Sequence, residues 1–436
     1  MNFYWHDVIV DFGSLVEEPG TMSSAAINVL ADELGTRYVP REVPRHEAEA
    51  WADRVGAVAE AGLPALVARL DHPSPGVRRA LAFVLSYVEA PELPTLLRAA
   101  IEVEPDAATT IGLLVALGRY PDRRRFLLDL TACGHSAATR FGAAFALLMR
   151  PSCAQVIGDD PAAGRDLDDR VIEALTLCVT DEIEPRLQEL PWMDPEWDSV
   201  VSVVGDRLRA YPDASARWLA RMLMMLRTGE CPGLWSFVCC RHAADLRDRH
   251  PSLAAPLGPL VGDLLSHPQT AIRRGALHSI DHWLDTPDTL DKARHLDRVA
   301  AALDAPGLSD LALGVLVRQD DARCLPALRR LLAGPLDTGT QGLLRAAAPF
   351  ADALMPDLRA RLSTDPAPPD ALLLLGGITA WTGLRAALPE LRQMRRSLNR
   401  RREEWRAALA LDQLQAILDR IAPDEHKPTN DEDRAQ

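Results

Sequence analysis

The chain of 436 residues is longer than an ordinary single domain, so it should hold several domains or one elongated array. It is 47% apolar and 25% charged, as in soluble globular proteins, and its low aromatic content of 5% with abundant Ala and Leu favours helix. The formal net charge of −14 argues against nucleic acid as the main ligand, because duplex-binding proteins normally carry a basic surplus.

Residues 1–62 are expected to form an N-terminal helical cap, with helices near Ser24–Leu34 and Glu47–Glu60. The opening residues MNFYWHDVIVDFG lack the basic and apolar regions of a secretory signal. The longest apolar run, Ala371–Trp381, is too short to span a bilayer. The seven cysteines are scattered and odd in number, which favours reduced thiols. We therefore expect a cytoplasmic protein without membrane association.

Two stretches, HPSPGVRRALAFV at His72–Val84 and HPQTAIRRGALHS at His267–Ser279, share a His-Pro, an aliphatic residue and an Arg-Arg pair. A second register consists of prolines near the start of amphipathic stretches, at Pro64, Pro94, Pro185, Pro259, Pro326, Pro356 and Pro389. Their spacings are multiples of about 32.5 residues, and self-similarity at such a period is typical of a solenoid.

The chemistry of each unit predicts a helical hairpin. Proline suits the first turn of a helix, and leucines such as Leu66 and Leu70 then form one apolar stripe. A short polar break follows, and a second helix opens with an aliphatic residue and Arg. Because such hairpins need neighbours to cover their apolar faces, residues 63–422 are predicted to form an all-α stack of about eleven units.

The regularity weakens in three segments, which we expect to be longer loops: Gly158–Asp169, Pro191–Ser199 and Thr228–Trp235. The tail at residues 423–436 is polar and acidic without apolar periodicity, so we expect it to be disordered.

These hairpins resemble HEAT repeats, particularly the short bacterial, phycobilin-lyase-like kind of the armadillo-type fold. The likeness is clearest over Leu63–Val88, Pro259–Leu284 and Asp321–Leu332, and the VDFGSL opening at Val10–Leu15 resembles the N-terminal caps of actinobacterial proteins of this type. The resemblance implies a right-handed α-solenoid. It implies little about activity, because HEAT repeats serve many unrelated functions.

The resemblance also implies a structural role for the first Arg of each pair. HEAT repeats commonly place an Asp before the second helix and an Arg near its start, and the two side chains pair. Here Asp71 precedes Arg78, which fits the pattern. Ser266 replaces the Asp before Arg273, so Arg273 is expected to use another acceptor, such as a carbonyl at a helix end.

A candidate binding surface lies on the second helices. Besides the apolar stripe Val77, Leu81, Val84 and Val88, the best repeat presents Arg79, Phe83 and Tyr87 on another face. The register maps these three to Arg274, His278 and His282, and to Phe141, Phe145 and Met149 in another unit. Second helices usually line the concave wall of HEAT arrays, so the stripe suits a protein partner. The alternative is that the stripe packs against the adjacent repeat, and the sequence leaves both readings open.

Two charged clusters have similarly divided readings. The loop with Trp192 and Trp197 also carries Asp194, Glu196 and Asp198, and it either holds a basic partner segment or is pinned by its tryptophans. The arginines Arg392, Arg395, Arg396, Arg400, Arg401, Arg402 and Arg406 resemble a nucleic-acid patch. Part of this positive charge can be neutralised by the acidic tail and by Glu390, Glu403, Glu404 and Asp412. The cluster is therefore interpreted as a solvated face of the last repeat rather than as a nucleic-acid site.

Metal sites are weakly indicated. His278 and His282 form an H-x-x-x-H pair, but Asp281 and Asp285 lie on a different face of the helix. Cys231, Cys239, Cys240 and His242 have irregular zinc-type spacing, for which buried thiols are the simpler explanation. We expect neither a metal nor a cofactor.

No nucleotide loop, Ser-His-Asp order or Cys-His pattern stands out. The sequence therefore favours a non-enzymatic scaffold that binds a protein or peptide partner, including a basic one, through its concave face. One alternative is an enzyme on a HEAT scaffold, like the bilin lyases or alkylpurine DNA glycosylases. Another is an immunity protein that neutralises a toxin encoded beside it, which an acidic surface suits.

Overall fold

The computed structural model describes residues 63, 67–68, 70–86, 90–118, 120, 123–148, 167–187, 200–284, 292–364, 367–368, 370–401 and 403–422. Regular structure in these residues is helical and no strand occurs in them, so the all-α prediction is confirmed. None of the helices in this part of the chain combines the length and apolar character needed to cross a membrane. The expected N-terminal cap, its two helices and the tail lie outside the described residues.

The chain divides into two compact units, Met1–Leu260 and Val261–Gln436, and the division falls inside one helix. The first unit contains α4 (Pro75–Leu85), α5 (Leu93–Val103), α6 (Ala107–Leu117), α7 (Arg124–Leu130), α8 (Ala137–Leu148), α9 (Asp169–Thr176), η2 (Leu177–Val179), α10 (Glu184–Leu187), α11 (Val200–Leu208), α12 (Pro212–Thr228), η3 (Gly233–Trp235), α13 (Ser236–Arg249) and α14 (Pro251–Ala254), with α15 (Leu257–Leu264) spanning the division.

The second unit continues with α16 (Thr270–Ser279), α17 (Asp281–Leu284), α18 (Lys292–Ala301), α19 (Ser309–Arg318), η4 (Ala322–Cys324), α20 (Leu325–Ala333), α21 (Thr338–Ala346), η5 (Ala348–Phe350), α22 (Ala351–Leu362), α23 (Ala371–Ile378), η6 (Leu384–Ala387), α24 (Leu388–Asn399) and α25 (Trp405–Ile421). Most of these helices are short, as expected for repeated hairpins.

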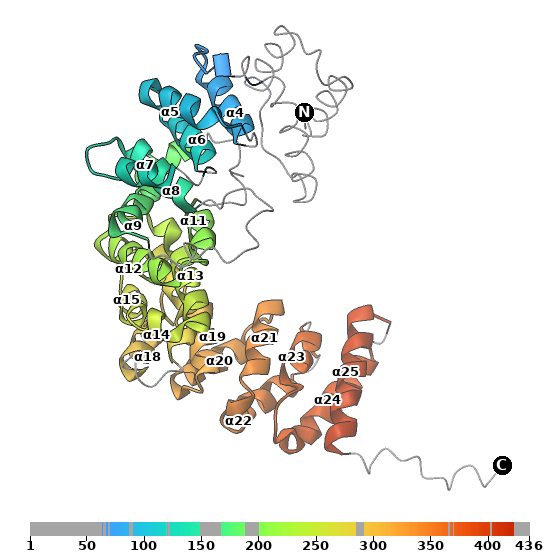
Figure 1. The fold of residues 1–436 in the computed structure, drawn as a ribbon. Coiled ribbons are helices and arrows are strands. Elements are labelled where there is room, and N and C mark those ends of the chain that lie inside the picture. The colour runs from blue at the N-terminus through green and yellow to red at the C-terminus, as the bar shows by residue number, and fades with distance from the viewer. Residues whose placement is uncertain are drawn as a thin grey trace, which may run out of the picture. The chain divides into compact units, whose positions relative to one another are not determined.

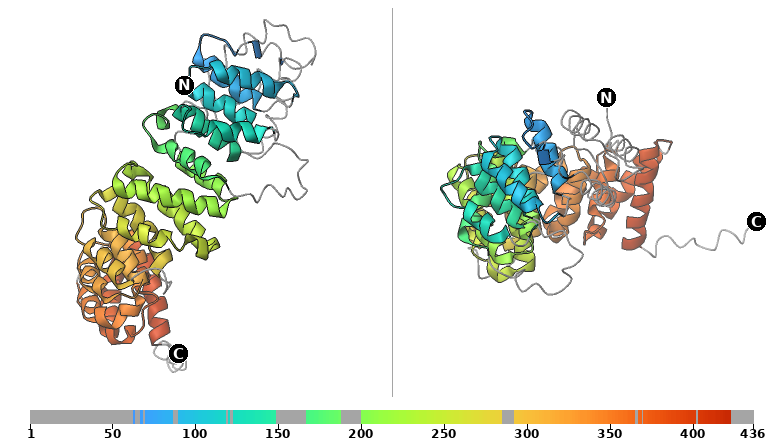
Figure 2. Two further views of the ribbon diagram at one scale, coloured as in Figure 1. Left: turned by 60° about the vertical axis from the view of Figure 1, so that its left-hand side comes forward. Right: turned by 45° about the horizontal axis from the view of Figure 1, so that its top comes forward.

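Helices of the first unit pack on their neighbours along the chain. The pairs α5–α6 and α7–α8 are in contact, and α6 also packs on α4 and α8 (Figures 1 and 2). Its sequence AATTIGLLVAL has no charged residue, and every residue from Ala108 to Leu117 is buried. A helix that is apolar on all sides must be covered on all sides, so α6 is a central core element of this unit.

A close approach joins α6 to α8. A Cβ atom added at Gly142 would lie 3.0 Å from the Cα atom of Ile111 and 2.9 Å from Cδ1 of Leu114. Glycine is therefore the residue that lets these two helices come so near, because it has no side chain to separate them.

In the second unit the helices form two rows. Helix α19 packs on α16 and α21, α21 on α23, and α23 on α25, while α20 packs on α22 and α22 on α24 (Figure 1). From α20 to α25, each hairpin thus contacts the next hairpin along the chain through both of its helices.

Among its described members, the proline register marks helix starts except at Pro356. Pro94, Pro326 and Pro389 occupy the first turn of α5, α20 and α24. Pro356 instead lies inside α22, because η5 leads into that helix, which begins at Ala351. The expectation that Pro356 opens a helix is therefore wrong.

Polar contacts between helices repeatedly join residues about one repeat apart. The backbone N–H of Leu336 donates to Asp370 at 2.7 Å, 34 residues away. The N–H of Ala367 donates to Ser397 Oγ at 2.8 Å, 30 residues away. Similar separations occur for Arg140 with Glu173 (33), Arg209 with Asp245 (36), Arg359 with Glu390 (31), and Trp381 with the carbonyl of Leu344 (37). The period seen in the sequence therefore recurs in the contacts.

Candidate functional site

The two His-Pro turns have the same local structure. In each, the His Nδ1 atom accepts the backbone N–H two residues later: His72 from Ser74 and His267 from Gln269, both at 3.1 Å. The His side chain thus closes the turn that precedes the second helix, as Asx turns do with a carboxylate or amide. This gives the His of the duplicated stretch a structural explanation.

Arg78 joins two successive hairpins. Its Nε and Nη2 atoms donate to the carboxylate of Glu104 at 2.9 and 2.8 Å, and its Nη1 atom donates to the carbonyl of His72 at 2.6 Å. The two side chains are only 9% and 3% exposed. The hydrogen bonds with Glu104 raise the pKa of Arg78. We call these contacts the Arg78 joint.

The structural role expected for Arg78 is confirmed, but the expected partner is wrong. Asp71 is exposed, whereas Glu104 directly follows α5, the first helix of the next hairpin. The Arg fork reaches forward by 26 residues rather than back by seven. A bidentate guanidinium–carboxylate pair with low exposure is the strongest of the common ion-pair geometries.

Arg273, which occupies the same place in the second copy, has no such partner. Its Nη2 atom approaches Thr270 Oγ1 at 3.4 Å, and its buried Nε atom has no hydrogen-bond partner in the described chain. Among the described residues its acceptor is therefore the Thr270 hydroxyl and not the expected carbonyl at a helix end. The duplicated Arg thus lies in two different environments.

The second Arg of each pair contacts the backbone or a neighbouring unit. Arg79 Nε donates to the carbonyl of Pro75 at 3.3 Å and lies 3.7 Å from Asp106. Arg274 Nη2 donates to the carbonyl of Gly307 at 3.2 Å, 33 residues away. Both of these candidate surface residues therefore also contribute to the packing of their units.

The aromatic residues of the candidate surface that the structure describes are buried rather than exposed. Phe141 and Phe145 are 1% and 5% exposed, and their rings stack at 5.7 Å between centroids. They belong to the core of α8, so their assignment to a partner-binding surface is wrong. The hydrophobic effect outweighs the register here, since α8 is covered by α6, α7 and α9. The side chain of Phe83, and the residues Tyr87, Met149, Trp192 and Trp197, lie outside what the structure describes.

His278 and His282 are exposed, but they do not share one helix. Helix α16 ends at Ser279 and α17 begins at Asp281. Partial burial and the positive charges of Arg274 and Arg318 lower the pKa of His278. Arg318 in turn donates to Asp281 at 2.6 Å, 37 residues away. These residues form a polar surface on α16, α17 and α19, which we call the α16 surface.

The Cys and His residues with zinc-type spacing are buried. Burial raises the pKa of Cys231 and of Cys240 to about 12, and that of Cys239 well above its usual range. Since the thiolate is the form that attacks electrophiles, these thiols are poor nucleophiles at neutral pH. Among the described residues no group of three or more His, Cys, Asp or Glu side chains could hold a metal ion.

His242 has a packing role that the sequence did not reveal. A Cβ added at Gly205 would lie 2.5 Å from its Nε2 atom, so the ring of His242 lies directly on the backbone of α11. A Cβ added at Gly262 would likewise overlap the buried ring of His295. Both units therefore contain a glycine that makes room for a histidine about one repeat later.

The arginines near the end of the chain are partly neutralised. Arg401 donates to Glu404 at 2.7 Å, and Glu390 accepts from Arg359 rather than from the cluster. Trp405 is 65% exposed, and the guanidinium of Arg406 lies 5.2 Å from its ring centroid. Glu390 therefore forms its hydrogen bond outside the cluster, whereas Glu404 forms its own within it.

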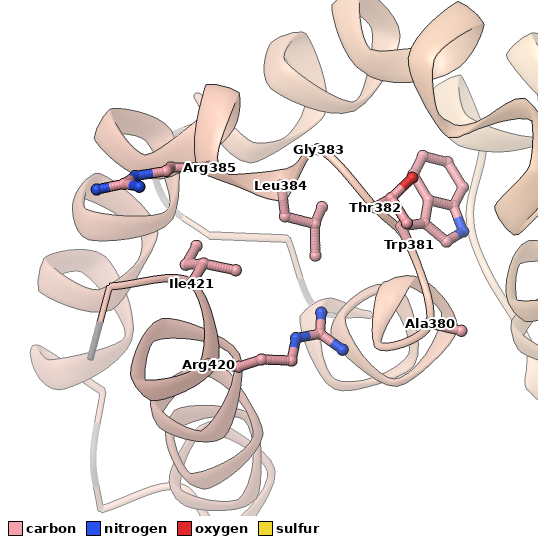
Figure 3. Close-up of a pocket in the computed structure, with 8 residues that line it drawn as sticks. All are labelled: Ala380, Trp381, Thr382, Gly383, Leu384, Arg385, Arg420 and Ile421. Carbon is pink, nitrogen blue, oxygen red and sulfur yellow. The ribbon is translucent and has the colours of Figure 1, made fainter.

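A pocket of about 420 Å³ lies where the segment after α23 meets the end of α25 (Figure 3). Its lining comes from residues 380–385 and 420–421, which are separated by 35 or more positions. No motif marked these residues in the sequence, because the two segments come together only through the stacking of α23, α24 and α25.

Neither the family models nor the curated proteins include a match to this chain.

Proposed function

We propose that the chain is a HEAT-like α-solenoid of about eleven right-handed hairpins and that it serves as a non-enzymatic cytoplasmic scaffold for a protein partner. The observation that carries the architectural part is the spacing of the inter-helix polar contacts, such as 34 residues for Leu336–Asp370 and 33 for Arg274–Gly307. A repeat that contacts only its neighbours produces this pattern. The resemblance of the repeated stretches to HEAT sequences agrees with it.

The packing of the second unit supports the same proposal. Rows of helices joined by nearest-neighbour contacts, as from α19 to α21 and α23, are how a solenoid accumulates a continuous core. Such arrays present extended surfaces, and their common use is to bind other macromolecules. An extended array of this kind therefore supports a binding function, and the α16 surface is a candidate location for it.

The α16 surface has the character of a protein-binding surface. Arg274, His278 and His282 are exposed, and Arg318 stands beside them on α19. Arg is enriched at interfaces because its planar fork forms several directed hydrogen bonds. Arg318 is paired with Asp281, so Arg274 supplies the excess positive charge of this surface, and we propose that the partner presents an acidic group here.

Site-specific photo-crosslinking tests this function. A photoreactive phenylalanine analogue replaces His282 in one variant and Ala360 in a control variant. Ala360 is exposed on α22, which belongs to the row of α20, α22 and α24. After irradiation in cells that naturally express the protein, we expect a discrete cross-linked partner from position 282 and none from position 360. Equal cross-linking from both positions, or none from position 282, would contradict the proposal.

A further inference from the structure

The pocket at the end of α25 has one charged side chain directed into it. In Figure 3 the guanidinium of Arg420 points into the space below Leu384, whereas that of Arg385 points away from it. The pocket is open to solvent on one side, and its volume of about 420 Å³ is enough for a group the size of an amino-acid residue.

Arg420 uses only part of its hydrogen-bonding capacity. Its Nη1 atom donates to the carbonyl of Thr379, which fixes the guanidinium at the pocket, and it has no carboxylate partner among the described residues. The neighbouring Asp419 instead accepts from Gln415 at 2.6 Å. Since a guanidinium has five N–H donors, most of the fork stays available to an incoming acceptor.

Other arginines in this unit contrast with Arg420. Arg361 binds both oxygens of Asp370 at 2.9 and 2.8 Å, and Arg359 binds Glu390 at 2.8 Å. On another element, the Oδ1 atom of Asp352 lies 3.2 Å from the position of a Cβ added at Gly383, which lines the pocket. The chain has 62 acidic and 48 basic residues, so carboxylate partners are plentiful. An arginine that lines a pocket without such a partner is therefore a position where a ligand can supply the carboxylate.

The rest of the lining is small or apolar. Ile421 directs its side chain toward the space and Ala380 closes it beside Arg420, while Leu384 lies behind them and is only 1% exposed (Figure 3). Thr382 adds a hydroxyl that makes no hydrogen bond within the described chain. The pocket thus combines one cationic fork and one hydroxyl with an apolar wall.

We propose that this pocket binds a carboxylate attached to a small branched apolar group, with the carboxylate on Arg420 and the apolar group against Ile421 and Ala380. A guanidinium and a carboxylate match in shape and charge and form paired hydrogen bonds. The C-terminal residue of a peptide and a free short aliphatic acid both have this chemistry. The pocket does not depend on the scaffold role, because its lining comes only from residues 380–383, η6 and α25.

Methyl NMR of the full chain with ¹³C-labelled isoleucine tests the proposal, and the Ile421 signal is assigned with an Ile421→Val variant. N-acetyl-leucine should shift this signal in a saturable way. N-acetyl-leucinamide, which differs only in lacking the carboxylate, should bind at least about tenfold more weakly. Arg420→Gln should weaken N-acetyl-leucine to the same extent. Arg396→Gln is the matched control and should change its affinity by less than about twofold, since Arg396 is an exposed arginine of α24 that does not line the pocket.

Isovalerate separates the two sources. Binding as tight as that of N-acetyl-leucine identifies a free aliphatic acid, and clearly weaker binding identifies a peptide terminus; either result supports the carboxylate site. Equal affinity for the acid and its amide, or an unchanged affinity in Arg420→Gln, overturns it. So does a shift of the Ile421 signal caused by Asp424→Asn/Glu425→Gln without added acid, because the chain's own carboxylates would then fill the pocket.

Discussion

The two copies of the His-Pro and Arg-Arg stretch are alike in their turns and different in their joints. His72 and His267 accept a backbone N–H at the same distance of 3.1 Å. Arg78 binds a buried carboxylate with two hydrogen bonds, whereas Arg273 has only a long contact of 3.4 Å to a hydroxyl. The same residues thus give the same local structure but different contacts between hairpins.

This difference between the two copies shows which residues determine each contact. The His bond closes within two residues, so the duplicated stretch carries both partners. The Arg78 joint needs Glu104, which belongs to the next hairpin and has the apolar residue Val299 at the corresponding position, 195 residues later. A repeat can therefore keep its helices while losing a joint, and the stability of successive hairpins should differ accordingly.

Removing Arg78 should have the largest effect. Arg78→Met leaves the buried Glu104 carboxylate without its partner, which typically costs about 3–5 kcal/mol. We expect a clear loss of thermal stability, measured by calorimetry on the full chain. In the double variant Arg78→Met/Glu104→Leu much of the loss should be recovered, because no buried charge is left unpaired. If Arg78→Met melted like the parent protein, the Arg78 joint would contribute nothing to stability, which would contradict the role proposed for it.

Helical glycines in the second unit should separate close packing from helix propensity. Gly262→Ala would place a Cβ inside the ring of His295 and should destabilise the protein by about 1–3 kcal/mol. Gly342 is the matched control, since it lies in α21 with no atom within 4 Å of an added Cβ. Gly342→Ala should stabilise by about 0.5–1 kcal/mol. Urea unfolding would show opposite shifts, and a shift in the same direction for both would contradict this packing.

The two His-Pro turns should respond equally. His72→Ala and His267→Ala each remove one turn hydrogen bond, which is worth about 0.5–1.5 kcal/mol. The Asn variants should retain much of this stability, because an Asn side chain can accept the same N–H. Hydrogen exchange of the first turns of α4 and α16 provides the measurement. Loss at only one of the two turns would show that they are not equivalent.

Arg273 should matter least. Its one long contact predicts that Arg273→Met changes stability by less than about 0.5 kcal/mol, as is usual for a substitution that breaks no strong interaction. The same substitution at Arg78 serves as the comparison, under the same calorimetric conditions. A loss as large as that for Arg78 would mean that Arg273 has a partner of comparable strength.

Much of the fold was predictable, because helix starts and hairpin breaks depend on nearby residues. The first-turn positions of Pro94 and Pro326 follow from the chemistry of proline, and the period of the register reappears in the contacts. The candidate surface was less predictable. Register placed Phe141 and Phe145 on an outer face, but α8 is covered on several sides and its aromatic side chains are core.

The partner of Arg78 and the pocket at Arg420 could not be predicted from local sequence. Glu104 and Asp71 are both acidic, and only the stacking of the next hairpin decides between them. The pocket joins Thr382 and Leu384 to Arg420, and no local pattern connects these positions. Contacts between units depend on the arrangement of helices, which a motif does not encode.

A pair of double-mutant cycles tests most directly that Arg78 joins its hairpin to the next one through Glu104. The first cycle combines Arg78→Met with Glu104→Leu, and the second combines Arg78→Met with Asp71→Asn. Opening free energies of α4 amides come from native-state hydrogen exchange. The account predicts a coupling of about 2–3 kcal/mol between Arg78 and Glu104, and one within about 0.5 kcal/mol of zero between Arg78 and Asp71. Strong coupling to Asp71 with none to Glu104 would contradict it.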